Sequence, residues 1–251
     1  MHPIEPPSFA RLYDAQYTQH QEDLPYWTKL ADRFGDPILE LGFGTGRVLL
    51  HLAQLGHQIA GLDNDPQMLA FTRQALKPPA SLRISLHHLD MTQFEFGHPF
   101  GLIIVPCNTF AYLDDEGARA CLKCCHRHLT PGKPLALDLP NPHLLQEQPP
   151  DPDHPITEFV EPDSGNPIQL YAQQERLGSG QFDVRWHYDE LKPDGTVQRH
   201  TFQQQYHLRS SQAITALMID NGFKSVEIFG DYEHAPLEAD SPRMLVVALA
   251  G

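Results

Sequence analysis

Residues 38–47 read Ile-Leu-Glu-Leu-Gly-Phe-Gly-Thr-Gly-Arg, a short apolar run followed by three glycines at alternate positions. The run predicts a buried strand, and the apolar spacing after Arg47 predicts a helix that ends near Gly56. Glycines let the backbone turn sharply and approach a ligand without Cβ clashes. The helix that follows presents free N–H groups to the same ligand. The segment therefore predicts a ligand-binding loop between a strand and a helix.

The order of strand, turn and helix repeats along the chain. Asp65 and Pro66 are typical of a helix start, the first as cap and the second at a position that needs no N–H. Such alternation favours a parallel, doubly wound sheet with right-handed crossovers. We predict an α/β fold in one domain over residues 1–251, built on a seven-stranded, mostly parallel sheet. Its expected strands lie at 38–41, 59–62, 82–89, 102–105, 135–139, 226–229 and 244–249.

The alternation of strands and helices is interrupted between residues 152 and 208. Alternating apolar and polar residues there, with the turn sequence Lys192-Pro193-Asp194-Gly195, indicate a hairpin and a small antiparallel β insertion. An insertion after the fifth strand emerges at the ligand-binding edge of a doubly wound sheet. We expect it to act as a lid over an acceptor pocket. The alternative is that it forms a dimer surface, because exposed sheets often pair.

Asp63 follows the second predicted strand, about twenty residues after the glycine loop. A carboxylate at this place can accept hydrogen bonds from both hydroxyls of a ribose. The alternative is a turn residue that caps the next helix, although Asp65 already suits that position. The spacing favours the ribose role.

The glycine loop, Asp63 and the pair Asp90-Met91 together resemble the class I S-adenosylmethionine-dependent methyltransferases. The C-terminal segments and the insertion resemble a small-molecule subgroup similar to sugar N,N-dimethyltransferases. The resemblance implies a Rossmann-like fold, S-adenosyl-L-methionine as cofactor and methyl transfer to a nitrogen or oxygen of a small acceptor. It also implies that Asp90 takes the adenine amino group and that Met91 packs on the ring. The cofactor-binding residues that we predict are Tyr13, Tyr17, Glu40, Gly42, Phe43, Gly44, Gly46, Asp63, Asn64, Met68, Asp90, Met91, Pro106 and Asn108.

The catalytic residues are less well defined by the sequence. The resemblance places Tyr13 and Tyr17 on a helix that folds over the cofactor, although aromatic packing on the sheet is an equal alternative. Asn108 follows the buried strand at 102–105, where it either faces a ligand or caps the loop. Methyl transfer from a sulfonium needs mainly proximity and alignment. Asn108 and Tyr13 are therefore the candidates, and no base is assigned.

The net charge of −14 argues against nucleic acid as a partner, because no Lys/Arg cluster offers a basic groove. No apolar run is long enough to span a membrane, and the first residues lack the order of a signal peptide. We therefore expect a cytoplasmic protein that acts on a small molecule, with a homodimer as one option. Cys121, Cys124 and Cys125 lie with two histidines on one predicted helix, which favours core packing over a metal site. His187, His200 and His207 on the insertion are further candidates only.

Two other functions would share part of this pattern. A nicotinamide-dependent oxidoreductase would use the glycine loop and Asp63, but position 47 is Arg where the dinucleotide fingerprint needs glycine. It would also leave Asp90-Met91 unexplained. A non-catalytic module that binds S-adenosylmethionine would keep every cofactor residue and lack turnover. The sequence favours the methyltransferase.

Overall fold

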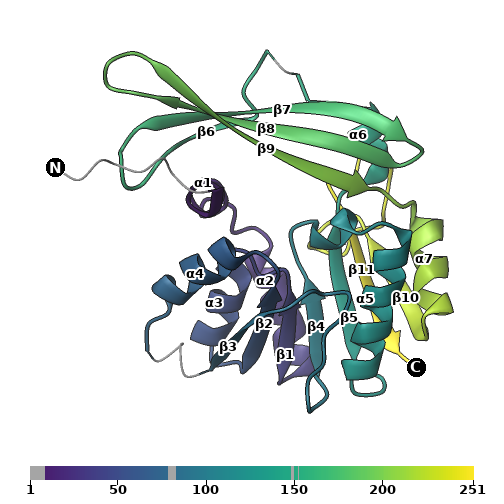
Figure 1. The fold of residues 1–251 in the computed structure, drawn as a ribbon. Coiled ribbons are helices and arrows are strands. Elements are labelled where there is room, and N and C mark those ends of the chain that lie inside the picture. Colours follow the sequence, from purple (N-terminus) through teal and green to yellow (C-terminus); the bar gives the residue numbers. More distant parts are fainter. Residues whose placement is uncertain (1–8, 79–82, 148–149, 152) are drawn as a thin grey trace.

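The computed structural model describes residues 9–78, 83–147, 150–151 and 153–251. A seven-stranded sheet forms the body of the molecule, and a four-stranded sheet lies across one end of it (Figure 1). The short helix α1 (Phe9–Tyr17) lies between the two sheets. Among the described residues no helix has the length and apolar character needed to cross a bilayer.

The main sheet has the order β10-β11-β5-β4-β1-β2-β3. Strands β1 to β5 pair in parallel, whereas β11 pairs antiparallel with β5 and β10. The central strands are buried along their whole length, as expected for a sheet covered on both faces. The predicted α/β fold is therefore confirmed. The strands are β1 (Ile38–Leu41), β2 (Ile59–Asp63), β3 (Ile84–His88), β4 (Leu102–Val105), β5 (Pro134–Leu139), β10 (Phe223–Phe229) and β11 (Met244–Ala250).

Helices cover both faces of this sheet, and local sequence signals set their ends. The Asp65 side chain accepts a hydrogen bond from the amide of Gln67, which confirms the predicted cap. Asp114 caps the next long helix in the same way, through the amide of Gly117. The helices are α2 (Leu24–Phe34), α3 (Arg47–Gln54), α4 (Pro66–Ala75), α5 (Asp115–His128), α6 (Pro142–Glu147) and α7 (Ser211–Asp220), with a 3₁₀ turn η2 (Thr109–Tyr112).

The second sheet is antiparallel and lies between α6 and α7 in the sequence. Its strands are β6 (Thr157–Val160), β7 (Pro167–Gly178), β8 (Gln181–Leu191) and β9 (Val197–His207), and they pair in that order. The inserted antiparallel sheet is thus confirmed as a fold element. Its predicted starting residue, 152, lies outside the described residues. Strand β6 and helix α6 were not predicted from the sequence, because both are short and Pro-rich segments surround them.

Helix α1 is bound to the inner face of the second sheet. Phe9 packs on Phe202 with ring centroids 4.3 Å apart. The hydroxyl of Tyr188 donates to Oε1 of Gln16 at 2.6 Å, and Arg11 forms an ion pair with the buried Glu161. The N-terminal aromatic residues therefore pack on the insertion, and this places α1 over the end of the main sheet.

Candidate functional site

A cavity of about 320 Å³ lies at the carboxyl ends of β1, β2 and β4, under helix α1 and the second sheet. Ligands of open α/β sheets bind at this edge. The lining residues come from several distant parts of the chain. They are Phe9, Tyr13, Gly42, Gly44, Leu62, Asp63, Asn64, Asp65, Met68, Leu89, Asp90, Met91, Thr109, Tyr112, Leu113 and Gln204.

The glycine loop forms the floor of the cavity. Gly42, Gly44 and Gly46 have φ angles of +66°, +55° and +86°, in the left-handed region that favours glycine. A Cβ atom at Gly42 would collide with the side chain of Thr109. A Cβ at Gly44 would meet only the ring of Tyr13, at 3.6 Å. The loop thus leaves open space at Gly44, on the side where a ligand would lie.

Asp63 holds this loop in place and also faces the cavity. Its Oδ2 accepts the amide N–H of Gly44 at 2.8 Å, and its Oδ1 accepts that of Asp65 at 2.9 Å. Burial raises the pKa of the Asp63 carboxyl, while these backbone hydrogen bonds lower it. The two interpretations offered by the sequence are therefore compatible, because each carboxylate oxygen has a second lone pair for a ligand hydroxyl.

The predicted adenine end of the site lies beyond Asp63. Asp90, Met91, Asn64 and Met68 all line the cavity. The Oδ1 of Asp90 accepts two hydrogen bonds of 2.8 Å from the amide and the hydroxyl of Thr92, which fixes the carboxylate. Two carboxylates, Asp63 and Asp90, are thus presented at one cavity wall together with apolar side chains.

Glu40 lies behind the loop in β1 and is fully enclosed. Its Oε2 is buried without a hydrogen-bond partner among the described residues. Burial raises the pKa of Glu40 to about 8, against the opposing effect of Arg47, and Asp23 and Asp63 raise it further. A buried carboxyl group with an unsatisfied oxygen is unfavourable in the absence of a ligand or water. Glu40 does not line the cavity itself, so its predicted contact with the cofactor stays a prediction.

The two N-terminal tyrosines have different positions. Tyr13 lines the cavity, whereas Tyr17 stacks on Tyr13 with ring centroids 4.4 Å apart and does not line it. Burial raises the pKa of Tyr13 well above its ordinary value, and Cys107 and Tyr17 act in the same direction. The Tyr13 hydroxyl is therefore neutral at physiological pH and can both donate and accept a hydrogen bond.

Four further predicted residues lie near the cavity without lining it. The Phe43 side chain is buried in the core against Gly61, so the loop can offer only its backbone there. Gly46 forms the N-cap of α3. Pro106 is buried after β4, and the amide of Asn108 donates to the carbonyl of Asp138 at 3.0 Å. Asn108 as a catalytic candidate stays a prediction.

Cys107 is a residue that sequence reasoning passed over. It adopts a left-handed φ of +55°, and the next residue, Asn108, does the same at +64°. Its Sγ lies 3.1 Å from Nη2 of Arg47, which also pairs with both carboxylate oxygens of Asp23. Consecutive left-handed residues other than glycine are uncommon and concentrate at functional sites. The turn after β4 therefore has the backbone conformation that is typical of a functional site.

Phe9, Thr109, Tyr112, Leu113 and Gln204 line the cavity and were also missed. Thr109 could have been found, because it directly follows Asn108, which the sequence had singled out. Gln204 lies on β9, and only the packing of the second sheet over the loop brings it to the cavity. The cysteines of α5, by contrast, are buried in the core, with the Sγ atoms of Cys121 and Cys125 4.0 Å apart. Across the described ranges, no three His, Cys, Asp or Glu residues form a group that could hold a metal ion.

Comparison with known proteins agrees with this geometry. Residues 38–132 match the family described as a methyltransferase domain. The putative methyltransferase YqeM of Bacillus subtilis (strain 168) is 28% identical over 148 residues, which make up 57% of this chain and 58% of that protein. The match therefore spans less than two thirds of this curated relative.

Solved structures match over almost the whole chain. DesVI of Streptomyces venezuelae superposes with a TM-score of 0.79 at 21% identity, covering 98% of this chain and 100% of that one. CalS10 of Micromonospora echinaspora, described as an amino pentose methyltransferase with S-adenosylmethionine bound, gives 0.73 at 20% identity, covering 99% and 100%. The chain therefore has the fold of these methyltransferases, and residues 38–132 match the methyltransferase domain family, as the sequence predicted.

Proposed function

We propose that this chain transfers a methyl group from S-adenosylmethionine to a nitrogen of a small, amine-bearing acceptor, with an amino sugar as the substrate class. The cavity carries this proposal. It joins a left-handed glycine loop, Asp63 and Asp90 at the sheet edge where the methyltransferase domain would hold its cofactor. A nicotinamide enzyme would share the loop and Asp63, but neither the domain match nor the compared structures support it.

The residues of the cavity fit this cofactor. Asp63 would hold the ribose hydroxyls, and Asp90 with Met91 would hold the adenine. The open space at Gly44 admits a ligand close to the backbone. The unpartnered Oε2 of Glu40 leaves one unsatisfied hydrogen-bonding group in the enclosed region behind the loop. When bound, S-adenosylmethionine supplies a methyl group that its sulfonium already activates.

The chain's own contribution is then positioning. The neutral hydroxyl of Tyr13 can accept a hydrogen bond from an amine N–H and orient the nitrogen lone pair. An amine must be neutral to act as a nucleophile, and burial under α1 and the second sheet disfavours the charged form. No covalent intermediate on the protein is needed. CalS10, which has the same fold, is described as an amino pentose methyltransferase, and this supports a sugar amine as the acceptor.

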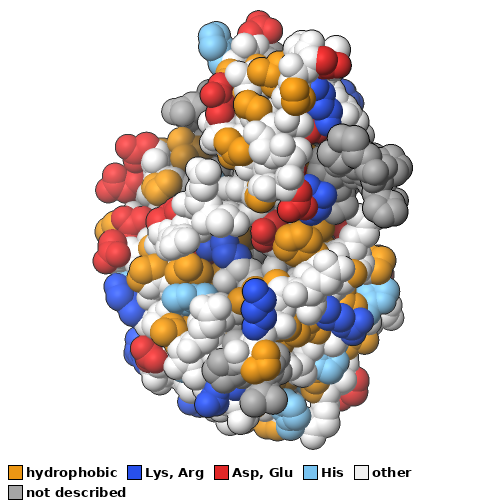
Figure 2. Space-filling view, turned by 90° about the vertical axis from the view of Figure 1, so that its left-hand side faces the viewer, with side chains coloured by type: hydrophobic (Ala, Val, Ile, Leu, Met, Phe, Trp, Pro, Cys, Tyr) orange, Lys and Arg blue, Asp and Glu red, His pale blue; other side chains and the backbone are white. Residues whose placement is uncertain are grey.

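We also propose a small-molecule acceptor rather than nucleic acid, and a cytoplasmic location. On the face turned to the viewer in Figure 2, Lys and Arg side chains are interspersed with acidic and uncharged ones. The outer face of the second sheet carries polar pairs such as Arg199 with Asp189 and Gln203 with Asp183. A polar face of this kind is better suited to contact with solvent than to the interface of an obligate homodimer. Sedimentation of the purified protein would test the oligomeric state.

The function is tested by turnover. The purified chain is incubated with S-adenosylmethionine and a panel of amino sugars, and S-adenosylhomocysteine is measured by mass spectrometry. We expect acceptor-dependent product, and none with the N-acetylated form of the same sugar, because its nitrogen lone pair is delocalised. S-adenosylhomocysteine should raise the melting temperature by mass action, whereas NAD should not. A larger increase of the melting temperature with NAD would contradict the proposal. Cofactor binding without turnover of any amine would indicate a non-catalytic binding module.

A further inference from the structure

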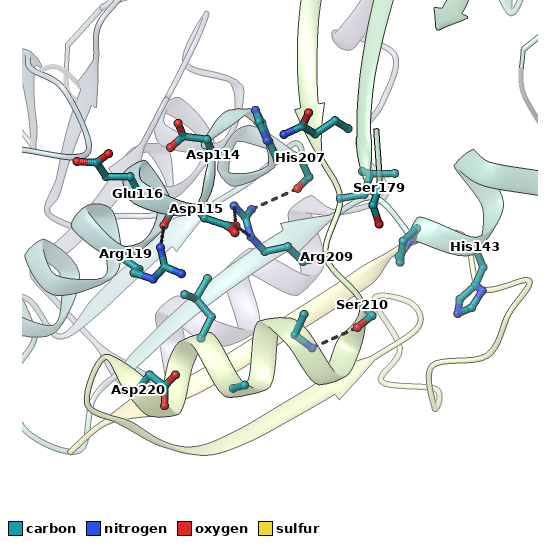
Figure 3. A pocket seen from close by; sticks show the side chains of 17 residues that line it. Asp114, Asp115, Glu116, Arg119, His143, Ser179, His207, Arg209, Ser210 and Asp220 are labelled. Carbon is teal, nitrogen blue, oxygen red and sulfur yellow. Dashed lines mark hydrogen bonds and ion pairs between the residues drawn. The ribbon is translucent and has the colours of Figure 1, made fainter. Parts of the chain in front are cut away.

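A second and larger hollow lies beside the cofactor cavity. It is a groove of about 890 Å³ between α5, α7, the turn that joins β7 to β8 and the end of β9 (Figure 3). Asp114, Asp115 and Glu116 border it on one side and His143 and Ser179 on the other, with Arg209 near its centre. None of the predicted cofactor residues lines it. The groove therefore remains without a role in the function proposed above.

Helix α7 is built to leave this space open. Ala213, Ala216, Leu217 and Asp220 line the groove at spacings that place them on one face of a helix. The two alanines are exposed, and their small side chains keep the wall low. Gln212 is exposed on the same helix and does not line the groove. One face of α7 can therefore be altered without changing the others.

The groove has an excess of negative charge. Its lining holds four carboxylates and two guanidinium groups, namely Asp114, Asp115, Glu116 and Asp220 with Arg119 and Arg209. Arg209 is committed to the carboxylate of Asp115 at 2.9 Å and to the carbonyl of Leu113 at 2.9 Å. The His207 side chain adds little positive charge, because burial and then Arg209 lower its pKa. A ligand with a cationic amine and hydroxyl groups suits such a surface, and an anionic ligand does not.

A pair of aromatic rings, Tyr112 and Tyr206, lies where chain segments of the two hollows meet, because Tyr112 lines the cavity and Tyr206 directly precedes His207 of the groove. Tyr112 packs edge-on against Tyr206 with centroids 5.1 Å apart, and the Tyr206 hydroxyl is hydrogen-bonded to Tyr112 and Trp186. Two segments of the chain next to this pair each contribute residues to both hollows. Leu113 lines the cavity and Asp114 the groove, while Gln204 on β9 lines the cavity and His207 the groove.

From this arrangement we propose that the groove binds the hydroxylated, amine-bearing body of the methyl acceptor, whose reacting nitrogen reaches the cofactor cavity past the Tyr112–Tyr206 pair. This inference rests on the proposed function for its last step alone. Binding of a cationic, hydroxyl-rich amine in the groove is a separate claim, which the charge and shape of the groove carry. The two claims can therefore fail independently.

The experiment measures binding directly. Glucosamine and kanamycin are titrated calorimetrically into the wild-type chain, with and without saturating S-adenosylhomocysteine, and N-acetylglucosamine serves as the uncharged probe. The variant Ala216→Trp fills the groove, and Gln212→Trp is its matched control on the same helix. The double variant Glu116→Gln/Asp220→Asn removes charge without adding volume. Thermal unfolding and S-adenosylhomocysteine affinity report on the integrity of each variant.

We expect the two amines to bind the wild-type chain more tightly than N-acetylglucosamine does. Ala216→Trp should weaken amine binding at least about tenfold, a difference of ~1.4 kcal/mol. The charge variant should weaken amines but not the uncharged probe, and Gln212→Trp should behave as wild type. Equal amine affinity in Ala216→Trp and wild type, or no amine binding by a folded wild-type chain, would overturn the proposal. If the wild-type chain bound the amines but did not bind S-adenosylhomocysteine, the result would count against the proposed function alone.

Discussion

At the scale of single residues, Asp63 has a structural role in the loop, and we propose that it also binds the cofactor. Asp63→Ala removes the acceptor of two backbone amides, so the ligand-free protein should lose about 1–2 kcal/mol of unfolding free energy. Cofactor affinity should fall further, by about 1.5–3 kcal/mol, because the ribose loses a charged acceptor. Chemical denaturation and calorimetric titration with S-adenosylhomocysteine measure the two effects.

Asp63→Asn separates these roles. The amide keeps one oxygen acceptor and nearly the same shape, so its stability loss should be the smaller of the two. Its affinity should still drop, since the charge is gone. If S-adenosylhomocysteine binds Asp63→Asn as tightly as wild type, the carboxylate serves the loop alone.

Glu40 makes a pH-dependent prediction. Its pKa is about 8 in the folded chain, above the ordinary value of 4.5, chiefly because of burial. The folded state thus holds a proton that the unfolded state releases, and stability must fall as pH rises between those two values. The contribution is fully present below pH 4.5 and lost as pH passes 8. We expect ligand-free protein to be less stable at the upper end of this window, by up to ~4 kcal/mol from this group.

Glu40→Gln isolates that contribution, because the variant cannot titrate and is close in shape. The difference in unfolding free energy between wild type and Glu40→Gln, measured by denaturant titration across the window, should grow with pH in favour of the variant. Parallel stability curves for the two proteins would contradict the elevated pKa.

At the scale of elements, the loop between β1 and α3 is the most restrictive segment. Gly44→Val places a β-branched residue at a φ of +55°, where such side chains are strained. The substitution also fills the open space beside Tyr13. We expect S-adenosylhomocysteine affinity to fall by at least about 2 kcal/mol while the sheet stays folded.

Gly195→Val is the matched control for backbone strain. Gly195 has a φ of +84° in the turn between β8 and β9, and a Cβ there meets no atom within 4 Å. Both variants should lose some stability, but only Gly44→Val should lose affinity. If titration gave the two variants equal affinities for S-adenosylhomocysteine, the ligand would not bind beside this loop.

Sequence patterns predicted the elements of this fold better than the walls of its cavity. Burial on both faces makes β4 apolar, and Asp65 with Pro66 is typical of a helix start. Both elements can therefore be predicted from their local sequence. Tyr112 and Gln204 carry no such signal. Their position depends on the packing of the second sheet over η2, a contact between segments about ninety residues apart. For Phe43 the motif predicted the loop, but it did not predict that the Phe43 side chain points into the core.

At the scale of the whole molecule, the second sheet and helix α1 depend on each other. Although burial raises the pKa of Glu161, the Arg11 guanidinium and the amide of Ser164 together lower it to about 2. Arg11→Met would leave this carboxylate buried without its cation, at a cost of about 1–3 kcal/mol. Because α1 also carries Phe9 and Tyr13, affinity for S-adenosylhomocysteine should fall about tenfold.

The comparison variant is Arg199→Met, which breaks the exposed pair with Asp189 on the outer face of the same sheet. Exposed pairs contribute little, so this change should alter stability by less than about 1 kcal/mol and leave affinity unchanged. Calorimetric titration of both variants decides the matter. Unchanged affinity in Arg11→Met would show that α1 holds its place without the insertion.

The scattered origin of the cavity wall has a consequence for how the protein is made. Tyr13 comes early in the chain, Asp63 and Asp90 follow, and Gln204 comes near the end. A nascent chain leaves the ribosome from its N-terminus, at about 5–20 residues per second. The glycine loop is therefore synthesised many seconds before β9 can close over it. We therefore expect the complete cavity, and with it full affinity for the cofactor, to arise late in translation.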